Sequence, residues 1–102
     1  MSNKNKKYGN HGKLFSAFPT SLNDICYHDM TDNETNEFLQ KLLYLGVLEA
    51  YFDIEDNENH SCTLFFEIGK NTNLKDLMIL IAKQRPHEFS EESENCFRMW
   101  FD

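Results

Sequence analysis

Two neighbouring stretches in the middle of the chain alternate between apolar and polar residues. The first runs from Val47 to Glu55 and the second from Ser61 to Ile68, with a turn-rich segment at 56–60 between them. The apolar side of this alternation consists of Leu48, Ala50, Phe52, Ile54, Cys62, Leu64, Phe66 and Ile68. Because successive side chains of a strand point to opposite faces of a sheet, a period of two predicts two half-buried strands that pair as a hairpin. Any fold of the chain has to accommodate this hairpin.

Apolar residues at helical spacing lie on both sides of the hairpin. Thr31 begins a capping box ahead of the first set, which predicts a helix over about 32–45. Thr72 or Asn73 can cap a second helix, which is expected to end near Gln84. The wide apolar stripes of these helices are typical of helices that pack on a sheet.

Two shorter apolar runs complete the expected secondary structure. Residues 13–18 are stopped by Pro19, and residues 96–101 follow an acidic connector at 87–95; both runs are typical of strands. The order is then strand, helix, strand, strand, helix, strand, which is the split βαβ plan of a ferredoxin-like sandwich. We therefore expect an α+β fold in which two helices cover one face of a four-stranded antiparallel sheet.

Length and composition predict one domain with a short tail. The chain has 102 residues, which suffices for a single small hydrophobic core. Residues 1–12 are polar and carry two glycines, so they bury too little apolar surface to offset the entropy of ordering. We expect a flexible basic tail at 1–12 and a single acidic α+β domain at 13–102.

The cysteines and the apolar runs indicate a cytoplasmic setting. Cys26, Cys62 and Cys96 are odd in number, widely spaced and without a CxxC pair, which does not suggest a disulfide framework or a structural zinc site. The longest apolar runs are far shorter than the roughly 20 residues that a membrane-spanning helix needs. We expect no association with membranes.

The charge of the chain is divided unevenly. Residues 1–13 carry four lysines and no acid, a net charge of +4, whereas residues 14–102 carry six bases and 17 acids, a net charge of −11. A body of this charge repels polyanions and attracts basic partners over a Debye length of about 8 Å at physiological salt. A basic protein is therefore the expected partner, and direct binding of nucleic acid is disfavoured.

The expected topology would collect many acids at one edge of the sheet. In the split βαβ plan, the connections at 19–31, 55–60 and 86–94 emerge at the same end, and they contain nine of the 17 acids and no Lys or Arg. These acids are Asp24, Asp29, Glu55, Asp56, Glu58, Glu88, Glu91, Glu92 and Glu94. Acids in any single loop favour solubility, but three converging acidic loops predict a binding edge for a basic partner.

The sheet face turned away from the helices is the second candidate surface. The period of two places Tyr51, Phe65 and Trp100 on this face together with Arg98. Large apolar rings that face water often mark a contact surface, here for the partner or for a second copy of the chain. A slip of one residue in strand register would put the same rings into the core, so both placements stay open.

Patterns typical of catalytic or metal-binding sites are weak. His28, His60 and His87 fall one in each of the converging loops, but no HxH or HExxH spacing supports a transition-metal site. A Cys26–His28 nucleophile dyad lacks a third, orienting group. The four glycines form neither a Walker loop nor a GxGxxG pattern. We therefore expect no enzyme activity, no cofactor and no metal.

Size, acidity and the expected cytoplasmic location are together similar to those of immunity proteins, which neutralise nuclease toxins delivered between bacteria. This similarity implies a small inhibitor that occludes the basic cleft of a nuclease. One alternative is a phage-encoded inhibitor of a host defence nuclease that mimics nucleic acid. Another is an RNA-binding module, because domains of the same plan stack bases on open-face aromatics such as Phe65. Residues 61–68 lack the basic, glycine-containing pattern of those domains.

Overall fold

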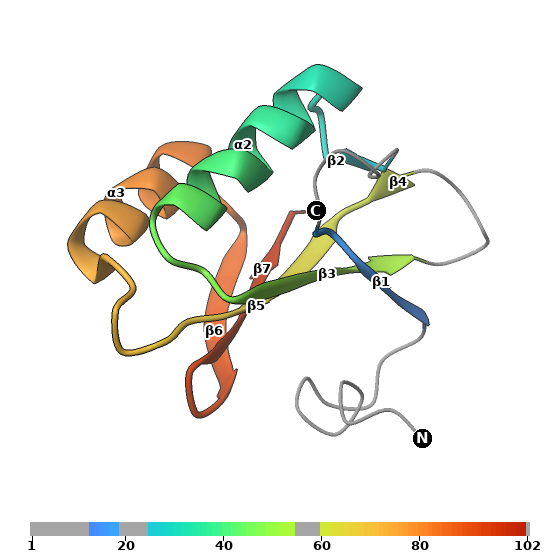
Figure 1. Cartoon of the computed structure of the whole chain (residues 1–102). Helices are drawn as coiled ribbons and strands as arrows, with labels where there is room; N and C mark the ends of the chain where they lie inside the picture. Colours follow the sequence, from blue (N-terminus) through green and yellow to red (C-terminus); the bar gives the residue numbers. More distant parts are fainter. Residues whose placement is uncertain (1–12, 19–24, 55–59, 102) are drawn as a thin grey trace.

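In the described part of the chain, five strands form one antiparallel sheet, and two helices cover one of its faces (Figure 1). The computed structural model of the chain describes residues 13–18, 25–54 and 60–101. In spatial order the strands of the sheet are β1 (Lys13–Ser16), β3 (Glu49–Ile54), β5 (Thr63–Glu67), β7 (Cys96–Trp100) and β6 (Glu88–Ser93). The helices are α2 (Asp32–Tyr44) and α3 (Leu74–Gln84). A separate parallel pair consists of β2 (Cys26–Tyr27) and β4 (His60–Ser61). The tail expected at 1–12 lies outside the described residues.

Both predicted helices are confirmed, together with their caps. In α2 the Thr31 hydroxyl accepts a hydrogen bond from the Glu34 amide at 3.1 Å, and the Glu34 carboxylate accepts one from the Thr31 amide at 2.9 Å. In α3 the Asn73 side chain accepts a hydrogen bond from the Asp76 amide at 3.2 Å. The residues that the helices bury are Thr35, Phe38, Leu39 and Leu42 in α2, and Leu77 and Ile81 in α3.

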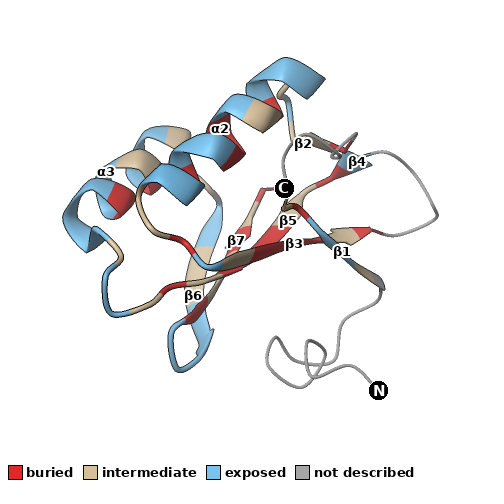
Figure 2. Cartoon of the chain, viewed as in Figure 1, coloured by how far each residue is buried: buried red, intermediate tan, exposed pale blue. Residues whose placement is uncertain are grey.

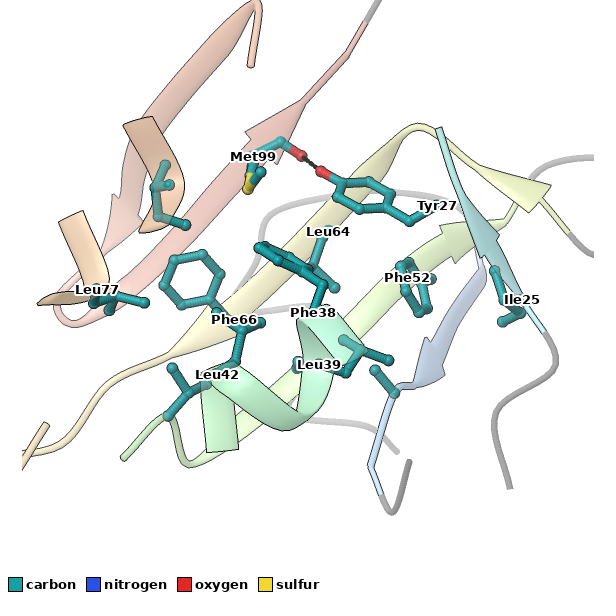
Figure 3. Close-up of a cluster of buried hydrophobic side chains, with 14 of the residues drawn as sticks. Ile25, Tyr27, Phe38, Leu39, Leu42, Phe52, Leu64, Phe66, Leu77 and Met99 are labelled. Carbon is teal, nitrogen blue, oxygen red and sulfur yellow. Dashed lines mark hydrogen bonds between the residues drawn. The ribbon is translucent and has the colours of Figure 1, made fainter. Parts of the chain in front are cut away.

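The central hairpin has the register that the alternation predicted. Phe52 lies opposite Leu64, Ala50 lies opposite Phe66, and Leu64 lies opposite Met99 of β7. All five side chains belong to the main hydrophobic core beneath the helices. Figure 3 shows this core, with side chains of α2, β3, β5 and β7 pointing toward one another.

Leu48 is an exception to the predicted pattern. The alternation placed it in the core, but 58% of its surface is exposed. Leu48 precedes β3 and lies against Gly69. If Gly69 carried a Cβ atom, that atom would be 2.9 Å from the Leu48 Cδ1 atom. The absence of a side chain at Gly69 therefore provides the space that Leu48 occupies.

The α+β class and the placement of the helices on one face are confirmed, but the sheet is not the four-stranded ferredoxin-like sheet. In the split βαβ plan, two strands joined through a helix are parallel and have another strand between them. Here β1 and β3 are direct neighbours and antiparallel, with Phe15 opposite Phe52. The reason is that the chain makes an additional pass between β1 and α2. It returns to the other end of the sheet, where Cys26 of β2 pairs with His60 of β4.

The acidic stretch expected to be a connector is a strand. Residues 88–93 form β6, which pairs with β7 so that Phe89 lies opposite Met99, with a register irregularity between Glu91 and Ser93. Phe89 packs against the core and stacks on Phe97 with 5.4 Å between ring centroids. A strand with one apolar residue and three glutamates gives no alternation to detect, and glutamate is depleted in strands. The core contact of Phe89 thus outweighs the local preference.

A buried tyrosine links the beginning of the domain to its last strand. Tyr27 is 0% exposed, and its hydroxyl donates a hydrogen bond to the Met99 carbonyl oxygen at 2.7 Å (Figure 3). Its ring contacts Phe52 and Phe101, with centroid distances of 5.5 and 5.4 Å. Burial raises the pKa of the Tyr27 hydroxyl far above its ordinary value, because the phenolate would lose its hydration.

Replacing either buried ring of the hairpin should destabilise the protein strongly. We expect Phe52→Ala and Phe66→Ala each to lower the free energy of unfolding by about 3–5 kcal/mol, the usual range for a fully buried phenylalanine. Chemical denaturation measures this difference. Tyr44→Ala is the matched control, because Tyr44 is 90% exposed and its removal should change stability little. Near-neutral results for both phenylalanines would contradict the register described above.

Tyr27 should make the protein sensitive to alkali. Because the pKa of the Tyr27 hydroxyl is raised in the folded protein, this hydroxyl ionises at a lower pH in the unfolded chain than in the folded one. Ionisation therefore favours the unfolded chain, and stability falls as the pH rises above about 10. Tyr27→Phe should lower stability by about 1–3 kcal/mol at neutral pH, since the buried Met99 carbonyl loses its donor. It should also remove part of the alkaline loss. Urea denaturation across this pH range, with Tyr44→Phe as control, measures both effects; identical pH slopes for Tyr27→Phe and the wild type would refute the assignment.

Candidate binding surfaces

β6 gives the sheet an open edge that is rich in glutamate. Among the described strands, β7 is the only one that pairs with β6, so the outer side of β6 faces away from the sheet. The exposed glutamates on this strand and on the turn that follows it are Glu88, Glu91, Glu92 and Glu94. We call these four residues the β6 acidic edge. They are four of the seven residues from Glu88 to Glu94.

Two of these glutamates also order the hairpin that carries them. The Glu91 carboxylate accepts a hydrogen bond from the Asn95 amide at 3.0 Å, across the β6–β7 turn. Asn95 has a φ of 66°, a left-handed conformation that asparagine adopts more readily than most residues. The Glu92 carboxylate accepts a hydrogen bond from the Ser90 hydroxyl at 2.8 Å. Each of these carboxylates keeps further acceptor capacity at an exposed position.

The described residues include five of the nine acids of the edge predicted from the sequence. Four of its members, Asp24, Glu55, Asp56 and Glu58, lie outside the described residues. Asp29 follows His28, whose amide donates a hydrogen bond to the Ser61 carbonyl oxygen just before β5. Glu88 lies opposite Trp100, at this same end of the sheet. Glu94 is at the other end, beside Asn95. The expectation that 86–94 is a loop at one end is therefore wrong, because β6 runs along the length of the sheet.

A pair of acids on the same sheet was not predicted from the sequence. Glu49 of β3 and Glu67 of β5 are direct cross-strand neighbours. The Tyr51 hydroxyl donates a hydrogen bond to the Glu49 carboxylate. Like charges directly opposite each other destabilise a sheet, and a donor such as the Tyr51 hydroxyl offsets part of this repulsion. The register of the hairpin is the signal that could have revealed it, since both glutamates occupy polar positions at the same end of the predicted strands.

The aromatic residues expected on the open face are mostly buried. Tyr51 is 7% exposed and Phe65 is 0% exposed, and together with Cys96 they form a small cluster separate from the main core. Phe65 alternates along β5 with Leu64 and Phe66 of the main core, so the cluster lies on the face opposite the helices. Neither the Tyr51 ring nor the Phe65 ring is exposed to solvent there. Figure 2 shows buried residues along the central strands and exposed residues on the outer side of the helices.

Trp100 lies at the edge of this face and keeps partial exposure. The Arg98 guanidinium is 5.7 Å from the centroid of the Trp100 ring, a cation–π arrangement. Arg98 also pairs with Glu88 at 2.7 Å between Nη1 and Oε1. The one arginine on β7 is thus engaged by its neighbours, and it connects the open face to the β6 acidic edge.

The three histidines named in the sequence analysis do come near one another, around Phe101. His28 stacks on the Phe101 ring with centroids 4.2 Å apart, and His87 approaches the same ring edge-on at 6.5 Å. The His60 Nε2 atom is 2.9 Å from the His28 carbonyl oxygen. In the described ranges, no group of three or more His, Cys, Asp or Glu side chains is arranged to hold a metal ion. These contacts are ring and backbone contacts.

One open hollow lies on α2 alone, lined by Glu37, Gln40, Lys41 and Tyr44. A more enclosed hollow lies between the two helices. It has a volume of about 190 Å³ and is lined by Met30, Glu34, Glu37, Phe38, Lys41 and Gln84. This volume is smaller than the roughly 300–1,000 Å³ of typical small-molecule sites. The surfaces that remain as candidates for function are the β6 acidic edge and the open sheet face.

Comparison of the chain with protein-family models, with curated proteins and with solved structures finds no match. Neither helix in the described part of the chain combines the length and the apolar character needed to cross a membrane.

Proposed function

We propose that this protein is a small acidic inhibitor that binds a basic surface of another protein. The observation that carries the proposal is the β6 acidic edge, where four exposed glutamates lie on and just after a strand that has one neighbour among the described strands. Such an edge attracts lysine and arginine side chains, and its field accelerates association with a basic partner. The net charge of −7 on the whole chain acts in the same direction.

The partner that this surface fits best is a nuclease. A cleft that binds nucleic acid is lined with lysine and arginine, and a protein surface rich in carboxylates can occupy it in place of phosphates. We propose an immunity protein that neutralises a bacterial nuclease toxin in the cytoplasm. A phage-encoded inhibitor of a host defence nuclease would use the same surface in the same way, so the identity of the partner distinguishes the two.

Charged residues on an edge strand have a second effect, because they prevent unwanted pairing between sheets of different molecules. Neutralising the glutamates distinguishes protection of the sheet edge from binding of the partner. Loss of edge protection leads to self-association of the purified protein, whereas loss of a binding surface slows association with the partner. An RNA-binding module is less well supported, because Tyr51 and Phe65 are buried and do not offer stacking surfaces.

An affinity pull-down from the native cell tests the proposal. The tagged protein is used as bait at low and at high salt, and captured proteins are identified by mass spectrometry. We expect one stoichiometric basic protein whose nuclease activity falls as the inhibitor is titrated in. Recovery of RNA instead, or of a partner whose activity is unchanged by the inhibitor, would reject inhibition of a nuclease.

The β6 acidic edge should control the association rate with the captured partner. We expect Glu91→Gln, Glu92→Gln and Glu94→Gln together to slow association about tenfold at low salt, with less effect as salt rises. Glutamine keeps a side-chain oxygen acceptor for the hydrogen bonds that order the turn. Stopped-flow mixing or surface plasmon resonance measures the rates.

A matched control changes the net charge equally at another place. Gln40→Lys, Tyr44→Lys and Asn71→Lys alter exposed residues on α2 and on the loop before α3. Their combination raises the net charge by three, as the three glutamine substitutions do, and should slow association far less. Equal slowing by the two triple variants would show that only net charge matters and that the β6 acidic edge is not the contact surface.

A further inference from the structure

The helix α3 carries apolar side chains at exposed positions as well as at buried ones. Leu77 and Ile81 are buried against the sheet. Leu74 is 48% exposed, Met78 is 37% exposed and Ile79 is 47% exposed. Exposed apolar side chains that gather on one element often mark a contact surface. The core therefore uses one side of α3, and a second apolar side faces water.

Part of this second side forms a flank of α3 that is turned away from α2. Gln84 lines the hollow between the helices, so its side of α3 faces α2. At 3.6 residues per turn, Met78 lies about 120° around the helix from Gln84, with the buried positions between them. Leu74 and the exposed Ala82 are each four residues from Met78 and share its flank. Figures 1 and 3 show α3 on the β6 and β7 side of the helical layer, so this flank lies on the side of the molecule that carries β6.

Basic side chains stand near both ends of this flank. Lys75 lies at the beginning of α3 and Arg85 is its C-cap residue, and both are exposed. They are roughly 15 Å apart along the helix axis at a rise of about 1.5 Å per residue. Neither forms an ion pair within the described part of the chain. The acid of the first turn, Asp76, accepts a hydrogen bond from the Asn73 side chain at 3.0 Å. The flank is thus apolar with a positive charge near each end, in a chain whose net charge is −7.

The β6 acidic edge on the same side of the molecule is complementary to this flank. Its exposed glutamates extend from Glu88 to Glu94, roughly 20 Å at about 3.3 Å per residue, which is similar to the separation of the two bases. One copy of the chain therefore presents a basic, partly apolar helix and an acidic strand beside each other. A half-turn of a second copy about an axis in the plane of this surface exchanges the two, so that α3 of each copy faces β6 of the other. Such a contact is self-complementary and closes at two copies.

We propose that two copies of the chain associate through this surface as a two-fold dimer, with Lys75 and Arg85 of each copy against the β6 acidic edge of the other. One helix and one strand from each copy make a small interface, so the dimer is weak and depends on concentration. The same edge carries the proposed inhibition, so a basic partner and a second copy compete for it. The dimer itself does not depend on that function, and the purified protein alone tests it.

Sedimentation equilibrium of the full chain over a wide range of concentration measures the association. We expect a monomer–dimer equilibrium that stops at two copies and weakens as salt rises. Leu74→Gln with Met78→Gln should raise the dissociation constant about tenfold, because the dimer removes these apolar side chains from water. The control, Leu43→Gln with Tyr44→Gln, changes exposed apolar residues of α2 and should leave the constant unchanged. A protein that stays monomeric, or a control that weakens the dimer equally, would overturn the proposal.

Reversed charges test the pairing between the two copies. Lys75→Glu with Arg85→Glu should weaken the dimer about tenfold. Glu92→Lys with Glu94→Lys should weaken it similarly, although this change brings the net charge of the chain nearer to zero. An equimolar mixture of the two variants should associate as strongly as the wild type, since every acidic surface then faces a basic one. Circular dichroism verifies that each variant is folded. A mixture that does not recover association, or a glutamate variant that associates more strongly than the wild type, would reject the pairing.

Discussion

β5 buries side chains on both of its faces, and the rest of the structure is arranged to cover it. Leu64, Phe65 and Phe66 are each 0% exposed, although they point alternately to opposite sides of the sheet. β5 is the third of five strands, so neighbouring strands pair with both of its backbone edges. Burying each of these side chains contributes about 1.5–3 kcal/mol. The helical layer covers one of these faces, and on the other face Phe65 packs in a cluster with Tyr51 and Cys96.

The sequence predicted the elements whose signals are local. The capping box at Thr31 and the alternation around Phe52 and Phe66 each reflect a periodicity that neighbouring residues impose on one another. The order of the strands depends on contacts between distant residues. β1 lies beside β3 because the chain first returns to form β2, and no short pattern in the sequence encodes that return.

The open face shows where periodicity alone is insufficient. Alternation correctly placed Tyr51 and Phe65 opposite the helices, but it does not say what covers them. The consecutive phenylalanines Phe65 and Phe66 were themselves a signal, since a strand with apolar rings on both sides is typical of a strand buried on both faces. The acidity of the candidate surface was predictable from composition, whereas its position was not, because Phe89 draws the glutamate-rich stretch into the sheet.

The position of β7 has a consequence for protein synthesis. It is the last of the described strands in chain order, yet it lies between β5 and β6 and supplies the carbonyl oxygen that the Tyr27 hydroxyl binds. While a ribosome translates the chain from its amino terminus, β6 emerges before the strand with which it pairs, and Phe89 has no ring of β7 to stack on. The sheet therefore closes only after residues 96–100 have left the ribosome, and until then β6 lacks the neighbour that holds it in the sheet.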